Sequence, residues 1–404
     1  MGAVCAGLVA LAAPAGAESV FAREGLGEWN DGYDLRGILL GSTGIGTVDP
    51  NNLTTLNPAS SAFAIGTLGH ASFLSSVRWT DDGTATARDL GTNLNQVSLH
   101  LDFGRGFGLR VMAAPATDAS YAFVQSVPTG FEEIETDMRR EEGTRGLTRY
   151  VAGMAWRGGR NWGVGAQAVI LAGSIVDHTR FVFGDSAAAH GWKSIEERRE
   201  LRFDTAASFA VGLLARPLPR VSFGAFFSTG ASPSVTETFR TSGEDDIERG
   251  TAEVDLPPAF GAGAAIFITP RWRLCGDVVQ RTWEDVAIAR PGGEAGERDF
   301  RNTTRWGIGL ERIPAFNRDA TPLASLVWRA GFAWIPWYVS DANGDGIDEW
   351  RATAGVGVPI QQNRGMIDIG AAYGRRGSRA ENGLEEQYVS FALGFTFARV
   401  LREY

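Results

Sequence analysis

The chain has 404 residues, with 47 acidic and 38 basic side chains and a formal net charge of −9. A chain of this charge lacks the basic face that nucleic-acid binding requires, so we expect no nucleic acid as a partner. The mean hydropathy is −0.09, and the body of the chain has no run of about eighteen apolar residues, which excludes a helical membrane protein. A membrane β-barrel stays compatible with this hydropathy, because half of each strand faces a polar lumen.

Residues 1–17 have the pattern of a secretory signal peptide. An apolar, Ala-rich core runs from Val4 to Ala13, and Ala15-Gly16-Ala17 forms an A-x-A cleavage site, although no Lys or Arg precedes the core. After cleavage Cys275 is the one remaining cysteine, so we expect no internal disulfide in the exported protein.

Residues 18–62 do not alternate in polarity and are rich in Gly, Asn and Asp. We expect this segment to form a hatch, a plug of irregular backbone inside the barrel that follows it. A barrel of about fourteen strands leaves an open lumen, and irregular backbone is tolerated there because the wall shields it from lipid. Asn57-Pro58 is predicted to fix a turn between the hatch and the first strand. The alternative is a mobile periplasmic tail.

From about residue 63 onward, apolar and polar residues alternate in about fourteen short segments. In the last segment Val389, Phe391, Leu393 and Phe397 fall on one face, with Ser390 on the other. Period-two alternation is the signature of β-strands, because successive side chains point to opposite faces. The expected strands are 63–79, 96–103, 107–114, 148–156, one from about 162, 203–213, 221–228, 254–268, 272–286, 305–311, 323–339, 350–360, 367–373 and 389–397.

The connections alternate between short turns and longer loops. With an even strand count and both barrel ends on one side, this is typical of bacterial outer-membrane barrels. Tryptophans near predicted strand ends fit the aromatic girdles of such barrels: Trp79, Trp156, Trp162, Trp272, Trp306 and Trp350. The sequence therefore predicts an all-β fold, a transmembrane antiparallel β-barrel of about 14 strands with an N-terminal hatch in the lumen. The predicted divisions are a signal peptide (1–17), a hatch (18–62) and the barrel (63–404), and a soluble all-β sandwich is the alternative.

The hatch segment resembles the entry region of FadL-type (TodX-family) outer-membrane transporters. The similarity lies in Arg36-Gly37, the Gly-rich stretch from Gly41 to Gly46, Asp49 and the Asn-Pro-Ala element. Leu256-Pro257-Pro258 and the stretch from Trp328 to Phe332 are similar to later parts of that family. The resemblance implies a hatch in the lumen formed by Arg36, Gly37, Gly41, Gly44, Gly46, Asn57, Pro58 and Ala59.

Pro115 ends the third predicted strand. Because Pro cannot donate to the ladder, it occurs at strand ends, edges and bulges. The resemblance implies a lateral gap here, through which hydrophobic substrate passes into the bilayer. The alternative is that Pro115 only ends the strand at the rim.

The loop at 341–349 matches the first half of a D-x-N-x-D-G calcium loop. Asp341, Asn343 and Asp345 supply oxygen ligands, while position twelve is Ala352, so Glu349 or Asp348 has to replace the missing carboxylate. Calcium is an optional ion here, and no cofactor is required. Acidic Gly-rich turns are also ordinary in exposed loops.

The sequence offers little support for catalysis, and we expect no enzyme. The four histidines lack metal spacing, and Ser98, His100 and Asp102 fit a polar lumen lining. We expect a monomeric outer-membrane protein of a Gram-negative bacterium, in contact with the bilayer. It would pass hydrophobic small molecules, such as long-chain fatty acids or aromatic hydrocarbons, by passive diffusion, with capture at loop phenylalanines such as Phe123 and Phe131, or Phe181 and Phe183. The alternative is a non-transporting barrel of the same fold that acts as a scaffold or a secretion-system partner.

Overall fold

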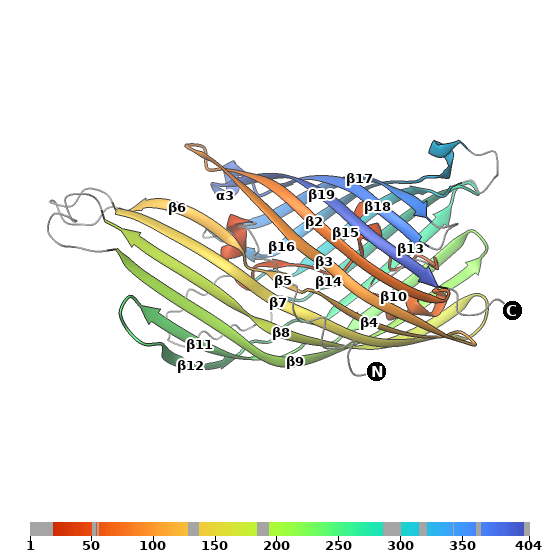
Figure 1. Cartoon of the computed structure of the whole chain (residues 1–404), viewed down its shortest axis with the longest axis horizontal. Coiled ribbons are helices and arrows are strands. Elements are labelled where there is room, and N and C mark those ends of the chain that lie inside the picture. The colour runs from red at the N-terminus through yellow and green to blue at the C-terminus, as the bar shows by residue number, and fades with distance from the viewer. Residues whose placement is uncertain are drawn as a thin grey trace.

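The wall of the molecule is one closed antiparallel barrel with the N-terminal segment inside it (Figure 1). The computed structural model describes residues 19–50, 54, 56–127, 137–183, 194–284, 286, 300–314, 321–341, 343–360 and 365–399. The predicted signal peptide and Phe131 lie outside these residues. The helices in the described part are too short and not apolar enough to cross a membrane.

The hatch comprises four short elements that precede the first wall strand. They are η1 (Val20–Arg23), β1 (Glu28–Trp29), α1 (Leu35–Leu39) and η2 (Pro58–Phe63).

Seventeen strand segments form the barrel, and β5 lies inside it. In chain order the wall and its connections contain β2 (Thr67–Asp81), β3 (Thr86–Gly104), β4 (Phe107–Pro115), β5 (Thr117–Asp118), β6 (Tyr121–Val127), β7 (Asp137–Arg157), β8 (Trp162–Val182), β9 (Ile195–Leu218), β10 (Val221–Ser228), β11 (Ser234–Thr241), β12 (Ile247–Glu253), β13 (Ala259–Phe267), β14 (Trp272–Arg281), β15 (Thr303–Arg312), η3 (Pro322–Ser325), β16 (Val327–Ser340), β17 (Gly346–Ile360), β18 (Gly365–Arg376), α3 (Arg379–Asn382) and β19 (Glu385–Arg399).

Three pairs of segments are halves of interrupted wall strands. β4 and β6 form one such strand, because both pair with β7. β10 and β11 form a second, because both pair with β9. β13 and β12 form a third, because they pair with β10 and β11 respectively. The seventeen segments therefore occupy fourteen positions, and the predicted fourteen-strand barrel is confirmed. The expected single strand at 254–268 is one of the interrupted ones, because Pro257 and Pro258 stand at its break and cannot donate to a ladder.

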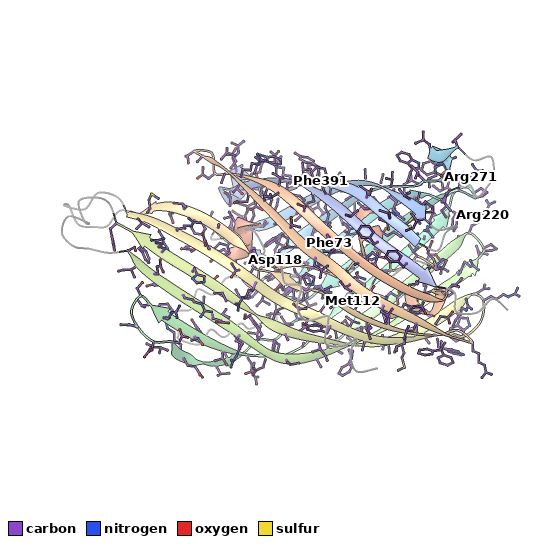
Figure 2. The ribbon with its side chains drawn as sticks, viewed as in Figure 1. Phe73, Met112, Asp118, Arg220, Arg271 and Phe391 are labelled. Carbon is purple, nitrogen blue, oxygen red and sulfur yellow. The ribbon has the colours of Figure 1, made fainter. Side chains whose placement is uncertain are left out.

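The barrel closes where β19 pairs with β2, in an unbroken register from Glu385↔Asp81 to Arg399↔Thr67. The outer face is apolar, as Figure 2 shows for Phe73 and Phe391, which are 42% and 60% exposed. Their neighbours Ser72 and Ser390 are buried in the lumen. The start of β2 lies at one end with most of the short turns, here called the turn end, and most of the long connections lie at the other, the loop end (Figure 1).

The lumen is packed rather than open. Toward the loop end, wall and hatch side chains form one apolar cluster, here called the upper cluster, in which the Trp283 and Tyr338 rings stack with centroids 4.1 Å apart. Its buried members are Leu26, Ala116, Ala119, Leu147, Leu171, Ile175, Phe203, Ala206, Ala231, Val235, Val254, Leu256, Trp283, Val286, Tyr338 and Val339. Buried charged side chains line other parts of the lumen, among them Arg36, Arg273 and Glu311.

Candidate functional site: the hatch and the wall around it

Arg36 joins the hatch to the wall through buried ion pairs. It lies in α1, whose N-cap Asp34 accepts from the backbone N–H of Gly37. Its guanidinium donates to both carboxylate oxygens of Glu311 on β15, at 2.9 and 2.8 Å, and pairs with Asp49 at 2.9 Å. Arg273 pairs with the same two acids and Arg329 with Glu311. Because Arg36, Arg273 and Glu311 are buried, removal of one of them would leave a buried charge uncompensated.

Gly44 lies in a turn whose backbone amides converge on one carboxylate. The N–H groups of Gly44 and Ile45 donate to Oδ2 of Asp277 on β14, at 2.7 and 2.9 Å. The Tyr33 hydroxyl donates to the same oxygen at 3.4 Å. Successive amides of this kind form a concave anion site, and here a wall side chain fills it.

Two hatch glycines meet the wall backbone directly. Gly41 has φ +66°, and a Cβ there would overlap backbone atoms of Ile308 and Phe332. A Cβ at Gly46 would overlap the backbone of Gly263 on β13. Close approach of two backbones is a recurrent reason for glycine, and it explains the Gly-rich stretch in the hatch.

Gly37 and the Asn-Pro-Ala element serve the shape of the hatch itself. A Cβ at Gly37 would lie 2.8 Å from the carbonyl oxygen of Thr43. Asn57 caps η2, because its Oδ1 accepts from the N–H of Ala59 at 3.0 Å, and its Nδ2 donates to the carbonyl oxygens of Ile45 and Leu213. Pro58 takes the first helical position, where a missing N–H has no cost, and Ala59 is fully buried.

Pro115 is the last residue of β4, where it pairs with Thr148. The chain then turns inward, and β5 pairs with β1 of the hatch. β3 pairs with β4 only from Val97 to Gly104, and β6 pairs with β7. In the described chain no strand therefore covers residues 86–96 of β3 on that side, and Figure 1 shows β3 and β6 diverging there. We call this interruption the β3–β6 gap.

A lumenal cavity of about 160 Å³ reaches the β3–β6 gap. Pro115, Asn93 and Asp118 line it on the gap side, and Trp29 and Tyr33 of the hatch line it on the other. Asn93 donates to Asp118 of β5 at 2.6 Å, so a hydrogen bond joins β3 to the inward-turned chain at the inner side of the gap.

Two carboxylates of the hatch are held ionised by wall arginines. Burial raises the pKa of Glu28, but the charges of Arg376 and Arg78 outweigh burial and lower it to about 2. For Asp31, burial is likewise outweighed by Arg305 and Arg281, and the pKa is again about 2. The hatch is therefore tied to the wall by charge at both ends of the cavity.

The residues of the predicted calcium loop do not converge. Asp341 Oδ1 accepts from the backbone N–H groups of Asn343 and Asp345, at 2.8 and 2.9 Å. Glu349 is buried in the lumen, where Arg376 donates to it at 2.6 Å. In the described chain no group of three or more His, Cys, Asp or Glu could hold a metal. Calcium binding at this loop stays a prediction that requires either Glu349 to leave Arg376 or Asp348 to leave Arg301.

The phenylalanines expected to capture substrate lie toward the loop end. Phe123 lies on β6 beneath Arg23, whose guanidinium carbon is 4.9 Å from the ring centroid, and Phe181 lies on β8 beneath Arg139 at 5.7 Å. Sequence reasoning missed the wall partners Asp277, Glu311 and Arg273. Their inward strand positions and their charge were the available signal, but alternation does not say which lumenal charge faces the hatch.

The fold defines the class: a plugged fourteen-strand barrel of the kind found in transporters of hydrophobic compounds. It is similar to a Pseudomonas aeruginosa FadL homologue, with a TM-score of 0.62 and 14% identity over 92% of this chain and 99% of that one. The toluene transporter TbuX of Ralstonia pickettii gives 0.57 and 14% over 91% and 98%, and the P. putida toluene transporter TodX gives 0.59 and 13% over 92% and 100%. The last two of these neighbours are toluene transporters.

The chain belongs to the BamG family, whose sequence model matches residues 1–400. No curated protein matches the sequence. The resemblance to FadL-type transporters is thus confirmed for the fold, while the family has its own name.

Proposed function

We propose that this protein is an outer-membrane channel that passes hydrophobic small molecules by diffusion through the β3–β6 gap. The observation that supports it most is the interruption of the third wall strand after Pro115, which leaves part of β3 without a partner beside a lumenal cavity. A substrate that leaves sideways enters the bilayer without crossing the hatch. The apolar upper cluster, to which Ala116 and Ala119 belong, gives the lumen toward the loop end a polarity that matches such a substrate.

The solved neighbours include two toluene transporters, so aromatic hydrocarbons are one candidate substrate class and long-chain fatty acids are the other. On this proposal the turn end faces the periplasm of a Gram-negative bacterium, because short turns take that side in bacterial barrels.

The test is to tie the gap shut. Asn93→Cys on β3 with Asp118→Cys on β5 places two thiols at the inner mouth of the gap, where these side chains are hydrogen-bonded, and a short bis-methanethiosulfonate reagent joins them reversibly. We expect uptake of labelled toluene or oleate, by a host without its own transporter, to fall to the level of the empty host. Reductant should then restore it.

Ser75→Cys with Thr92→Cys is the matched control, because these residues are already paired between β2 and β3. Cross-linking there should leave uptake unchanged. If uptake survives closure of the gap, the lateral route is wrong; if the protein gives no uptake in any form, the channel function is wrong.

One observation favours a second candidate, a barrel that serves as a scaffold or secretion partner without transport. The upper cluster fills the lumen toward the loop end with wall side chains, and the cavities there are small, about 70 and 160 Å³. A protein that co-purifies stably with a lumen free of lipid would support this candidate.

A further inference from the structure

The two ends of the barrel carry opposite charge. Five connections at the turn end include the described residues 104–106, 157–161, 216–220, 268–271 and 312–314, and these described residues contain seven arginines and no acidic residue. We call these arginines the basic rim: Arg105, Arg157, Arg160, Arg216, Arg220, Arg271 and Arg312. Loops at the other end are acidic, with Asp82, Glu244, Asp245, Asp246, Asp341 and Asp345. Figure 2 shows Arg220 and Arg271 at the tip of the turn end.

The basic rim has no internal counter-charge. Within the described residues, no arginine of the rim lies within 4.0 Å of a carboxylate oxygen, whereas Arg36, Arg273, Arg329 and Arg376 in the lumen are all paired. Four rim arginines from three turns, Arg105, Arg157, Arg160 and Arg216, border one open depression. Like charges gathered without partners repel one another, so an external anion would stabilise this arrangement.

Aromatic side chains place the rim at a definite depth. Trp156 precedes Arg157, Trp162 follows Arg160 by two residues, and Trp272 follows Arg271. These three rings are 38–40% exposed on the outer wall, and the Trp156 and Trp162 rings meet edge to face with centroids 5.4 Å apart. Exposed tryptophans at strand ends mark the membrane interface. Guanidinium groups one or two residues further out then lie level with the lipid headgroups.

We propose that the basic rim binds the phosphate groups of anionic glycerophospholipids in the leaflet next to the turn end. Arginine pairs with phosphate through two parallel N–H bonds, and clustered cations attract anionic lipid at a membrane surface. The rim comes from five turns spread along the barrel, which fits a ring of lipids better than one docked protein. The inference rests on the membrane placement in the proposed function, but not on transport.

The test compares lipid retention by the full chain and by charge-neutral variants. Each protein is reconstituted in nanodiscs of phosphatidylcholine and phosphatidylglycerol in equal parts, then delipidated gently and analysed by native mass spectrometry. We expect the wild-type protein to retain phosphatidylglycerol in preference to phosphatidylcholine. The variant R105Q/R157Q/R160Q/R216Q should lose this preference, and R220Q/R271Q, on other turns, should lose part of it.

The matched control is R140Q/R180Q/R240Q/R379Q, which removes four exposed arginines at the loop end. It should keep the preference of the wild type. The proposal is overturned if the control loses as much lipid as the rim variant, or if both rim variants retain phosphatidylglycerol normally. It is also overturned if they keep the lipid and lose only a co-purified acidic protein.

Three measurements on each variant separate the possible outcomes: folding, toluene uptake and retention of anionic lipid. Heat-modifiable migration on gels reports whether each variant folds, and R220Q/R271Q provides a second reading if the fourfold variant does not. Toluene uptake reports the proposed transport. If the protein retains anionic lipid but does not transport toluene, the proposed channel function is wrong and lipid binding by the basic rim stands. If it transports toluene but does not retain anionic lipid, only the proposed lipid binding is wrong.

Discussion

Individual carboxylates of the hatch bind it to the wall through ion pairs with arginines, and Asp31 is the clearest example. Its side chain accepts from Arg281 at 3.0 Å and from Arg305, while its backbone oxygen accepts from Arg149 at 2.8 Å. A buried acid is normally destabilised in its charged form, but two close guanidinium groups reverse that preference. The Asp31 carboxylate therefore stays ionised and keeps the hatch bound to the wall arginines over a wide pH range.

The depressed pKa of Asp31 predicts an acid-sensitive contribution to stability. Because its pKa is about 2 in the folded protein, the stabilisation is fully present above about pH 4 and is lost as the pH falls toward 2. Asp31→Asn should lower the stability of hatch docking at neutral pH by on the order of 2 kcal/mol and flatten its pH dependence below pH 4.

Hydrogen exchange of the hatch amides between pH 2 and pH 7 measures this effect. Asp246→Asn, on an exposed loop, is the control and should match the wild type. Equal protection in the Asp31 variant at every pH would refute the assignment.

Between elements, the contact of hatch and wall depends on glycines on both sides. A Cβ at Gly331 on β16 would overlap backbone atoms of Leu40 and Gly41, and Gly307 and Gly309 on β15 face the same stretch. A wall strand does not need glycine for its own pairing, and glycine weakens a strand. These wall glycines are therefore explained by the hatch rather than by the barrel.

Gly331→Ala should accordingly loosen the hatch without opening the barrel. We expect faster proteolysis of the hatch in the variant, and a destabilisation of about 1–3 kcal/mol as for other overpacked sites. Gly69→Ala on β2 is the matched control, because a Cβ there meets nothing within 4 Å. Unchanged proteolysis of the Gly331 variant would show that the hatch backbone adjusts without loss.

On the scale of the whole molecule, wall and hatch are stabilised in different ways. The wall closes on itself through continuous strand pairing from β2 to β19, which leaves no free edge except at interruptions such as the β3–β6 gap. The hatch depends on ion pairs and close backbone contacts to the lumen. A barrel of this size keeps its shape without contents, because the ladder itself is closed.

Deletion of residues 18–57 should therefore leave a folded barrel with an open, water-filled lumen. The lumenal charges that now pair with the hatch would be hydrated instead of buried. We expect heat-modifiable migration to be retained and a large ionic conductance to appear in planar bilayers, whereas the full chain should conduct little. A deletion variant that does not fold would show that the hatch is needed to form the wall.

The sequence by itself determined the wall. Period-two alternation in segments such as 389–397, with tryptophans near the strand ends, predicted the barrel and its fourteen positions, since a strand that separates lipid from lumen must alternate. It did not reveal the interruptions after Ser228 and Glu253, because a break in a strand and a bulge within it have similar local sequences.

Only the tertiary structure decided what the lumen contains. It paired Arg36 with Glu311 and Gly44 with Asp277, residues more than two hundred positions apart. It turned the chain after Pro115 inward to join β1, which exposes the edge of β3, and it gathered the basic rim from five separate turns. The alternation of polarity predicts which face of the wall each side chain occupies. It does not predict the partner of that side chain, because the partner depends on how strands distant in the sequence are arranged around the closed barrel.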